Sequence, residues 1–236
     1  MSSFRSFTLL HLVTLAGVAL AIVLLVRGGL AWRGTRRERW LAAGVATAIL
    51  VLRAGVFVWN LLPPRLSLER SLPLQICDLA ALCAALALVT PRRWLAAIAY
   101  FWGLALSIQG LVQPDLDHGP ASLAFWAFWL HHALIVGAAV YVVAVRDFRP
   151  SARDLRLAIG AGLAYVAVVF VVDLVLGVNY GYLGRDVPNQ PTLIDWLGPW
   201  PWRVLIMVVL GAAVMVLLWL PWRHRAGRRR GAAPGS

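Results

Sequence analysis

Two residues inside apolar segments of this sequence, Cys77 and His132, have side chains suited to nucleophilic chemistry. A thiol attacks efficiently once a base has taken its proton, and histidine titrates in the range that this step requires. Taken singly, a buried cysteine or histidine is more often a packing residue. Helical rise places the two about 6–8 Å apart in depth, a gap that helix tilt would have to close. We predict Cys77 as the nucleophile and His132 as its general base.

Three charged residues, Arg53, Asp78 and Asp173, also lie within apolar segments. An unpaired charge at membrane depth costs several kcal/mol, so each needs a partner. Arg53 and Asp78 lie within about one helical turn of each other in depth, which favours an ion pair between them. Asp173 either takes Arg53 instead or caps polar backbone near the outer end of its helix. The alternative interpretation of such a pair is purely structural: it fixes the register of two helices.

Other polar residues surround this pair in the sequence. His131 points about 100° away from His132 on a helix and either faces Asp78 or supports the catalytic residues from behind. Gln75 and Asn179 complete the predicted binding residues. The two cysteines, Cys77 and Cys83, do not have the spacing of a zinc site, and we interpret Cys83 as a packing residue. We expect no metal and no soluble cofactor.

The composition indicates the environment of these residues. Hydrophobic residues make up 61% of the 236 residues and charged residues only 14%, and the mean hydropathy is +0.77. Soluble domains carry about 25% charged residues, and a globule of this size cannot hide so much apolar surface from water. The composition therefore excludes a soluble domain, a disordered chain and a disulfide-stapled scaffold, and it predicts a polytopic membrane protein.

Seven apolar segments are long enough to cross a hydrocarbon core of about 30 Å. They cover residues 8–26, 40–62, 72–90, 94–112, 122–145, 157–178 and 202–220. We predict an all-α fold, a polytopic bundle of seven transmembrane helices that forms a single domain over residues 1–236.

The arginines predict the orientation of this bundle. All 22 basic residues are arginines, and sixteen of them fall in the 27–39, 91–93 and 146–156 loops and in the C-terminal tail, against five on the opposite side. By the positive-inside rule, the N-terminus is outside and residues 223–236 form a basic cytoplasmic tail. The predicted polar pocket then lies in the outer half of the bundle. Because the arginines occupy short membrane loops, we do not expect nucleic acid as a partner.

Several motifs resemble those of a known family. The segments Leu72-Pro-Leu-Gln-Ile-Cys-Asp-Leu-Ala80 and Ala99-Tyr-Phe-Trp-Gly-Leu104 resemble the YwaF-like family of bacterial integral membrane proteins. The resemblance continues through Gln113-Pro-Asp115, the histidine-bearing fifth segment, Gly177-Val-Asn-Tyr-Gly-Tyr-Leu183 and Leu197-Gly-Pro-Trp-Pro-Trp202, and it covers about residues 35–222. It implies a multi-pass protein of the bacterial cytoplasmic membrane.

The same segments are distantly similar to the eukaryotic transmembrane protein 164 family. That resemblance implies an acyltransferase acting on ether phospholipids, with its intramembrane cysteine at Cys77 and its histidine at His132. In this sequence His131 and Gln75 stand where the family usually has a smaller residue and a histidine.

Three functions remain open on the sequence alone. The first is an intramembrane acyltransferase or lipid hydrolase with membrane phospholipids as partners, in which Arg53 holds a lipid phosphate or an oxyanion and Asp78 orients Arg53 or a histidine. The second is a small-solute transporter or membrane sensor whose charged residues line a polar path. The third is a scaffold whose polar residues only hold helices together.

Overall fold

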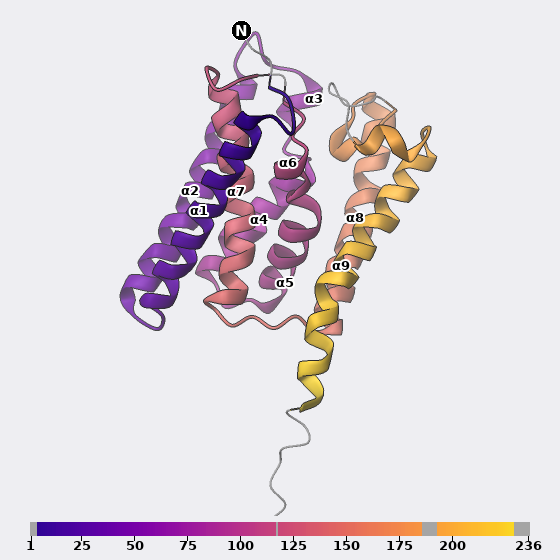
Figure 1. Cartoon of the computed structure of the whole chain (residues 1–236). Coiled ribbons are helices and arrows are strands. Elements are labelled where there is room, and N and C mark those ends of the chain that lie inside the picture. Colours follow the sequence, from indigo (N-terminus) through magenta and orange to yellow (C-terminus); the bar gives the residue numbers. More distant parts are fainter. Residues whose placement is uncertain (1–3, 117, 186–192, 229–236) are drawn as a thin grey trace, which may run out of the picture.

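The chain forms a bundle of helices. The computed structural model describes residues 4–116, 118–185 and 193–228, and these residues contain no strands. The elements, in chain order, are α1 (Leu9–Ala31), α2 (Arg36–Leu61), α3 (Leu68–Ser71), α4 (Ile76–Val89), α5 (Arg93–Phe101), η1 (Trp102–Ser107), α6 (Gln109–Val112), α7 (Leu123–Ala144), α8 (Ala152–Leu176), η2 (Tyr180–Tyr182), η3 (Leu193–Leu197) and α9 (Trp202–Arg228). The described chain begins at one end of the bundle, and α9 ends at the opposite end (Figure 1).

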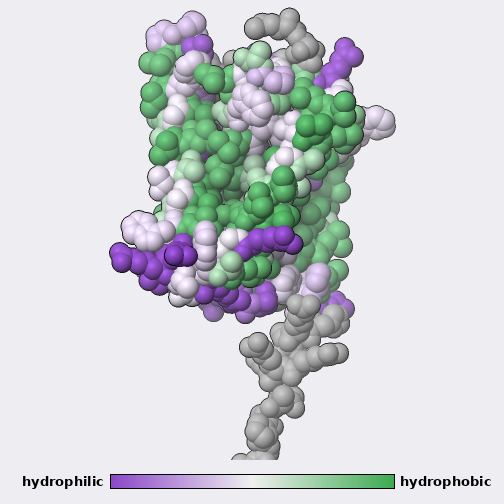
Figure 2. All heavy atoms as spheres, turned by 60° about the vertical axis from the view of Figure 1, so that its left-hand side comes forward, coloured by the Kyte–Doolittle hydropathy of each residue, from purple (hydrophilic) through white to green (hydrophobic). Residues whose placement is uncertain are grey.

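Six of these helical stretches are long and apolar enough to cross a membrane by length and composition. They are α1, α2, the continuous stretch Arg93–Val112, α7, α8 and α9. The apolar side chains form a belt on the face that Figure 2 shows, and strongly hydrophilic residues gather at the lower end of that view. Such a belt between polar ends is the surface expected of a multi-pass membrane protein.

The helix α4 is the centre of the bundle, between α2, α5 and α7. Its alanines at 80, 81, 84 and 85 are fully buried. Small side chains let neighbouring helices approach closely, which is how helices associate in lipid. The core therefore surrounds α4, whereas α1, α2, α8 and α9 present mostly exposed apolar residues.

The third predicted segment, 72–90, is helical only in its second part. The helix α4 begins at Ile76 and has 14 residues, which corresponds to about 21 Å. Pro73 is the physical reason, because a proline disfavours the helical conformation of the residue before it; Leu72 has φ −89° and ψ 134°. The first turn of α4 therefore comes after a stretch of non-helical backbone.

Helix caps place other boundaries differently from the apolar pattern. Thr35 caps α2, with its side chain accepting from the Glu38 N–H at 3.4 Å, so the predicted 27–39 loop is a short turn between two helices. Ser151 and Asp154 form a capping box that starts α8 at Ala152, well before the predicted start at residue 157. At the other terminus, α9 continues to Arg228, so the predicted 223–236 tail begins as helix. Its last part, residues 229–236, lies outside the described residues.

The predicted segment 94–112 contains a π-helical stretch, η1, between α5 and α6. Such bulges are often found at functional sites. Immediately after it, Gly110 lies against the ring of His132 on α7, and a Cβ at this position would clash with that ring. The absent side chain therefore makes room for a buried histidine.

Candidate active site

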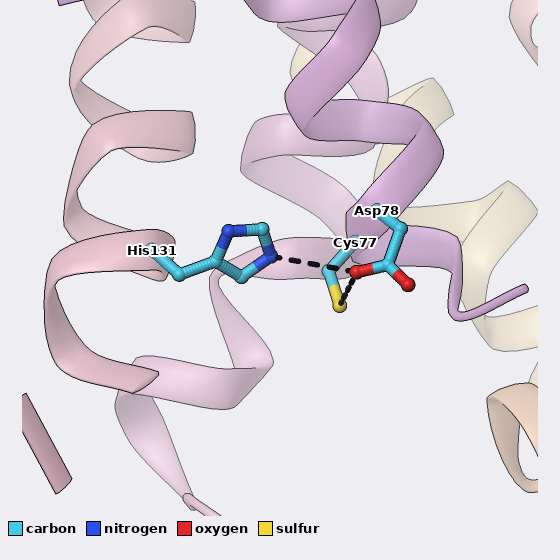
Figure 3. Close-up of side chains that lie close together, drawn as sticks. All are labelled: Cys77, Asp78 and His131. Carbon is cyan, nitrogen blue, oxygen red and sulfur yellow. Dashed lines mark hydrogen bonds and ion pairs between the residues drawn. The ribbon is translucent and has the colours of Figure 1, made fainter. Parts of the chain in front are cut away.

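Cys77 and Asp78 lie in the first turn of α4, and His131 of α7 points toward them (Figure 3). The Cys77 Sγ atom and the His131 Nε2 atom each lie 3.9 Å from Asp78 Oδ1. The sulfur, the carboxylate oxygen and a ring nitrogen of His131 all lie within 4.8 Å of one another. Two helices thus bring a thiol, an acid and an imidazole together inside an apolar bundle.

Arg53 of α2 completes this group. Its Nη2 atom lies 2.8 Å from Asp78 Oδ1, which confirms the predicted ion pair. The Asp78 side chain is only 9% exposed and that of Arg53 is 22% exposed. Because the pair is largely shielded from water, each charge depends on the other. The same carboxylate oxygen therefore faces the guanidinium, the thiol and the imidazole.

His132, the predicted general base, lies beside this group rather than within it. Its Nδ1 atom is 2.9 Å from the Phe128 carbonyl oxygen, and its ring lies against Gly110. The rings of His131 and His132 have centroids 5.1 Å apart. The structure therefore places His131, to which the sequence analysis gave a supporting role, in one group with the Cys77 sulfur and Asp78.

Two tyrosines hold the non-helical segment that leads into α4. Tyr165 of α8 donates from its hydroxyl to the Leu74 carbonyl oxygen at 2.7 Å. The Tyr180 hydroxyl accepts from the Leu72 N–H at 3.1 Å and donates to the Leu68 carbonyl oxygen. These bonds satisfy backbone groups that would otherwise be unpaired at this depth. The position of Cys77 thus depends on α8 and on the loop that follows it.

Gln75, Asp173 and Asn179 belong to the same loop framework and not to the group around the sulfur. Gln75 Oε1 accepts from the Gly181 N–H at 2.9 Å, and Asp173 Oδ1 accepts from the Tyr180 N–H at 3.0 Å. Asn179 Oδ1 accepts from the Gly184 N–H at 2.9 Å. Asp173 therefore caps polar backbone, which is one of the two roles expected of it. Because Gln75 is the N-cap of α4 but bonds elsewhere, it gives that helix no side-chain cap.

The tyrosines of the loop after α8 remain neutral hydrogen-bond donors at ordinary pH. Burial raises the pKa of both Tyr180 and Tyr182, and the neighbouring Asp115 carboxylate raises that of Tyr182 further. The Tyr182 hydroxyl lies 3.2 Å from Asp115 Oδ2. The loop is thus held by uncharged hydroxyl groups, which suits a segment packed against an apolar bundle.

Of the side chains around the Cys77 sulfur, His131 has an atom that could form a further hydrogen bond. It is 7% exposed, and its buried Nε2 atom has no hydrogen-bond partner in the part of the chain that the structure describes. A buried polar atom without a partner costs about 1–3 kcal/mol, so it calls for an explanation. A general base requires such a free nitrogen.

The same three side chains offer atom types that a zinc ion accepts. However, the Arg53 guanidinium already occupies the Asp78 oxygen that a metal would need. A second cation at that oxygen would be repelled by the first. The Arg53 guanidinium at this carboxylate therefore disfavours a metal ion there.

Sequence reasoning missed the roles of Tyr165 and Tyr180. Both are polar aromatic residues, and Tyr165 lies within a predicted membrane segment, where a hydroxyl needs a partner. That requirement was a usable signal, but it did not reveal the partner. The carbonyl and amide groups that they bind belong to the segment before α4. We expected most of that segment to be helical, so that its backbone groups would bond within the helix.

Comparison with known proteins gives the family. The sequence model of the TMEM164 family matches residues 6–219. An uncharacterized protein of Treponema pallidum (strain Nichols) is 28% identical over 181 residues, which cover 77% of this chain and 74% of that protein. No solved structure gives a significant match. The family match spans nearly the whole bundle, including the helices that carry Arg53, Cys77 and His131, and the chain therefore belongs to the TMEM164 family.

Proposed function

We propose that this protein is an intramembrane cysteine acyltransferase that moves an acyl chain between phospholipids. One observation carries the proposal: at the first turn of α4, the Cys77 thiol lies within 4.8 Å of a ring nitrogen of His131, and the His131 Nε2 atom has no hydrogen-bond partner among the described residues. The resemblance seen in the sequence supports the reaction class. The apolar belt around the bundle supports a lipid substrate.

The first half of the reaction forms a thioester. His131 takes the proton of the Cys77 thiol, and the sulfur attacks the carbonyl carbon of a phospholipid ester. A carbon–sulfur bond forms and the carbonyl oxygen becomes an oxyanion. When the oxyanion collapses, the carbon–oxygen ester bond breaks, and His131 gives the proton to the departing oxygen of the lysophospholipid.

The second half returns the thiol. The hydroxyl group of a second lysophospholipid attacks the thioester carbonyl, and His131 takes its proton. The new ester bond forms, the carbon–sulfur bond breaks, and the proton returns to the Cys77 sulfur. With water in place of the lipid hydroxyl, the same steps release a fatty acid, so exclusion of water decides between a transferase and a hydrolase.

The surroundings of the sulfur suit this chemistry. Burial disfavours a free thiolate, so a nearby base is needed to generate it during attack. The first turn of α4 has no side-chain cap, and the Asp78 N–H donates to the Gln75 carbonyl oxygen. The positive end of the helix dipole at this turn favours a developing oxyanion nearby. Arg53, which Asp78 holds in place, adds a positive charge for the oxyanion or for the lipid phosphate.

An apolar groove supports the binding of an acyl chain. A cavity of about 370 Å³ lies between α4, α5 and α8, and Leu79, Leu82, Trp94 and Trp102 are among its lining residues. Leu79 follows Asp78 directly, while Trp94 stands at the start of α5. Because Leu82 and Trp94 are about half exposed, the groove opens on the lipid-facing surface of the bundle. A lipid can thus enter from the membrane.

The membrane arrangement that we propose is the one expected from the sequence. The protein crosses the membrane seven times with its N-terminus outside, and α4 with the residues before it forms the third crossing. The described chain starts and ends at opposite ends of the bundle, as an odd number of crossings requires (Figure 1). The arginine-rich end is cytoplasmic. The chain belongs to the YwaF-like group of proteins and lies in the bacterial cytoplasmic membrane. The site then opens toward the outer leaflet.

The test is acyl exchange by the purified protein in liposomes, with a labelled lysophospholipid as acceptor. Cys77→Ala is expected to abolish exchange. Cys83→Ala is the matched control for the thiol, since it removes the other free thiol of the same helix. Because Cys83 lines the proposed acyl groove, this variant is expected to keep exchange while changing its preference for acyl-chain length. The folding of both variants is compared by thermal unfolding, and a chelator is added in a parallel assay.

Full exchange by a folded Cys77→Ala variant would reject the covalent mechanism. Loss of exchange on chelation would show that Cys77, Asp78 and His131 form a metal site and not a proton-transfer site.

Transport has less support, because the buried alanines of α4 separate the site from the arginine-rich end and offer no polar path along that helix. A scaffold has less support because a thiol, a carboxylate and an imidazole lie within 4.8 Å of one another, a combination that helix packing alone does not require.

A further inference from the structure

A second cavity lies at the opposite, arginine-rich end of the bundle. It has a volume of about 580 Å³ and is formed by the turn between α1 and α2, the last residues of α4 and the end of α7. Its polar lining includes Arg33 and Arg39 from the α1–α2 turn and the start of α2, and Arg146 from the residues after α7. The size falls within the range of small-molecule sites.

The cavity has an excess of positive charge. Its one lining acid, Glu38, is buried, and Glu38 Oε1 accepts from the Tyr141 hydroxyl at 2.7 Å and from Arg146 Nε at 2.9 Å. The charge of Glu38 is therefore matched by that of Arg146. Arg33 and Arg39 are exposed and form no ion pair with any described residue. Two guanidinium groups thus remain available to an anion.

The rest of the lining is apolar. Leu88 and Val89, from the last turn of α4, form one wall, and Val145 forms another part of it. Val89 is about half exposed, so this wall continues onto the lipid-facing surface. A ligand that fits such a lining has an anionic head and an apolar body.

We propose that this cavity binds the phosphate headgroup of an anionic membrane phospholipid. Guanidinium groups recognise phosphate oxygens with well-matched hydrogen bonds. The lining combines arginines with apolar residues, as expected at the level where lipid headgroups meet acyl chains. The acyl chains of the bound lipid then lie against Leu88 and Val89. This site is distinct from the one around Cys77, and its assignment does not depend on the proposed function.

The experiment measures lipid binding to the purified full-length protein by native mass spectrometry. Dioleoylphosphatidylglycerol is compared with dioleoylphosphatidylcholine, and sn-glycerol 3-phosphate is the soluble phosphate probe. We expect retention of the anionic lipid and little retention of the zwitterionic one. Binding of glycerol phosphate as strong as that of the lipid would overturn the lipid assignment in favour of a soluble phosphate compound.

Two double variants separate a built site from general surface charge. Arg33→Gln with Arg39→Gln removes the unpaired guanidinium groups of the cavity, whereas Arg36→Gln with Arg37→Gln removes the same charge from residues of the same region that do not line it. Since each arginine near an anionic lipid contributes about fivefold in affinity, the cavity variant is expected to lose about 25-fold. The control is expected to lose less than threefold.

An equal loss in both double variants would overturn the proposal, because it would mean that diffuse charge attracts the lipid. Unchanged binding in the cavity variant would overturn it as well. The thermal unfolding temperature of each variant in detergent alone shows that these differences do not arise from misfolding.

Discussion

Two residues of α2, Glu38 and Arg53, carry opposite charges, and each is neutralised by a partner from another part of the bundle. Near the start of this helix, Glu38 is held by Tyr141 and Arg146; further along, Arg53 is held by Asp78. Both acids of these pairs are largely buried, with exposed fractions of 8% and 9%. Both pairs therefore tie α2 to a neighbouring helix or to the segment that follows one.

The surroundings of the two pairs differ. At the Glu38 end, a tyrosine hydroxyl and a guanidinium satisfy the same carboxylate oxygen at ordinary hydrogen-bond lengths. Around Arg53, the Asp78 carboxylate also faces a thiol and an imidazole at 3.9 Å, and the Nε2 atom of that imidazole has no hydrogen-bond partner among the described residues. A satisfied network stabilises the fold, whereas unsatisfied reactive groups at close range indicate chemistry.

The largest expected effect distinguishes the two histidines. His131→Ala is expected to lower the acyl-exchange rate about 10²–10⁴-fold, the usual contribution of a general base. His132→Ala is expected to lower it less than tenfold, since its Nδ1 atom bonds to backbone and its ring fills space beside Gly110. Initial rates in liposomes measure both. The reverse order of the two effects would move the base to His132, as the family resemblance implies.

A second pair of variants separates an effect on stability from an effect on acyl exchange. Glu38→Gln removes the charge that Arg146 needs and is expected to lower the free energy of unfolding by about 1.5–3 kcal/mol, with exchange retained. Asp78→Asn is expected to lower exchange at least tenfold, because Arg53 and His131 lose the group that orients them. Denaturant unfolding in detergent and the exchange assay are run on both proteins. If Glu38→Gln were the more damaging change to exchange, the division between a structural and a reactive end would be wrong.

The smallest effects come from two tyrosines. Tyr141→Phe removes the hydrogen bond to Glu38, and Tyr180→Phe removes those to Leu72 and Leu68. Each is expected to cost about 1 kcal/mol of stability. Only Tyr180→Phe is expected to slow exchange, by several-fold, because it loosens the segment before Cys77. Equal exchange rates for the two variants would mean that this segment does not position the thiol.

Much of the fold follows from apolar runs alone. All seven predicted segments contain helix, because a run of about 20 apolar residues has no other way to satisfy its backbone in lipid. The boundaries shifted where polar side chains act locally: Thr35 and Ser151 cap helices that begin within arginine-rich stretches. A hydropathy pattern contains no information about such caps or about the effect of Pro73 on the third segment.

The site was predictable in composition but not in detail. Because a buried ion needs a counter-ion, the sequence favoured Asp78 as the partner of Arg53, while Asp173 stayed open as an alternative. The choice between His131 and His132 depends on helix rotation, which small side chains such as Gly110 set through packing. No single-sequence pattern reports that rotation. The buried Glu38 was likewise hidden, because it lies in a charged run that reads as a solvent-exposed loop.

The central claim is that Cys77 carries the acyl chain during transfer, and one measurement tests it directly. The purified protein is incubated with a phospholipid that bears a single defined acyl chain, quenched in acid, digested and analysed by mass spectrometry. We predict a peptide containing Cys77 whose mass is increased by that acyl group and restored by hydroxylamine, with Cys83 unmodified. An active preparation in which Cys77 stays free throughout turnover, or in which the acyl group is found on Cys83 instead, would contradict the account.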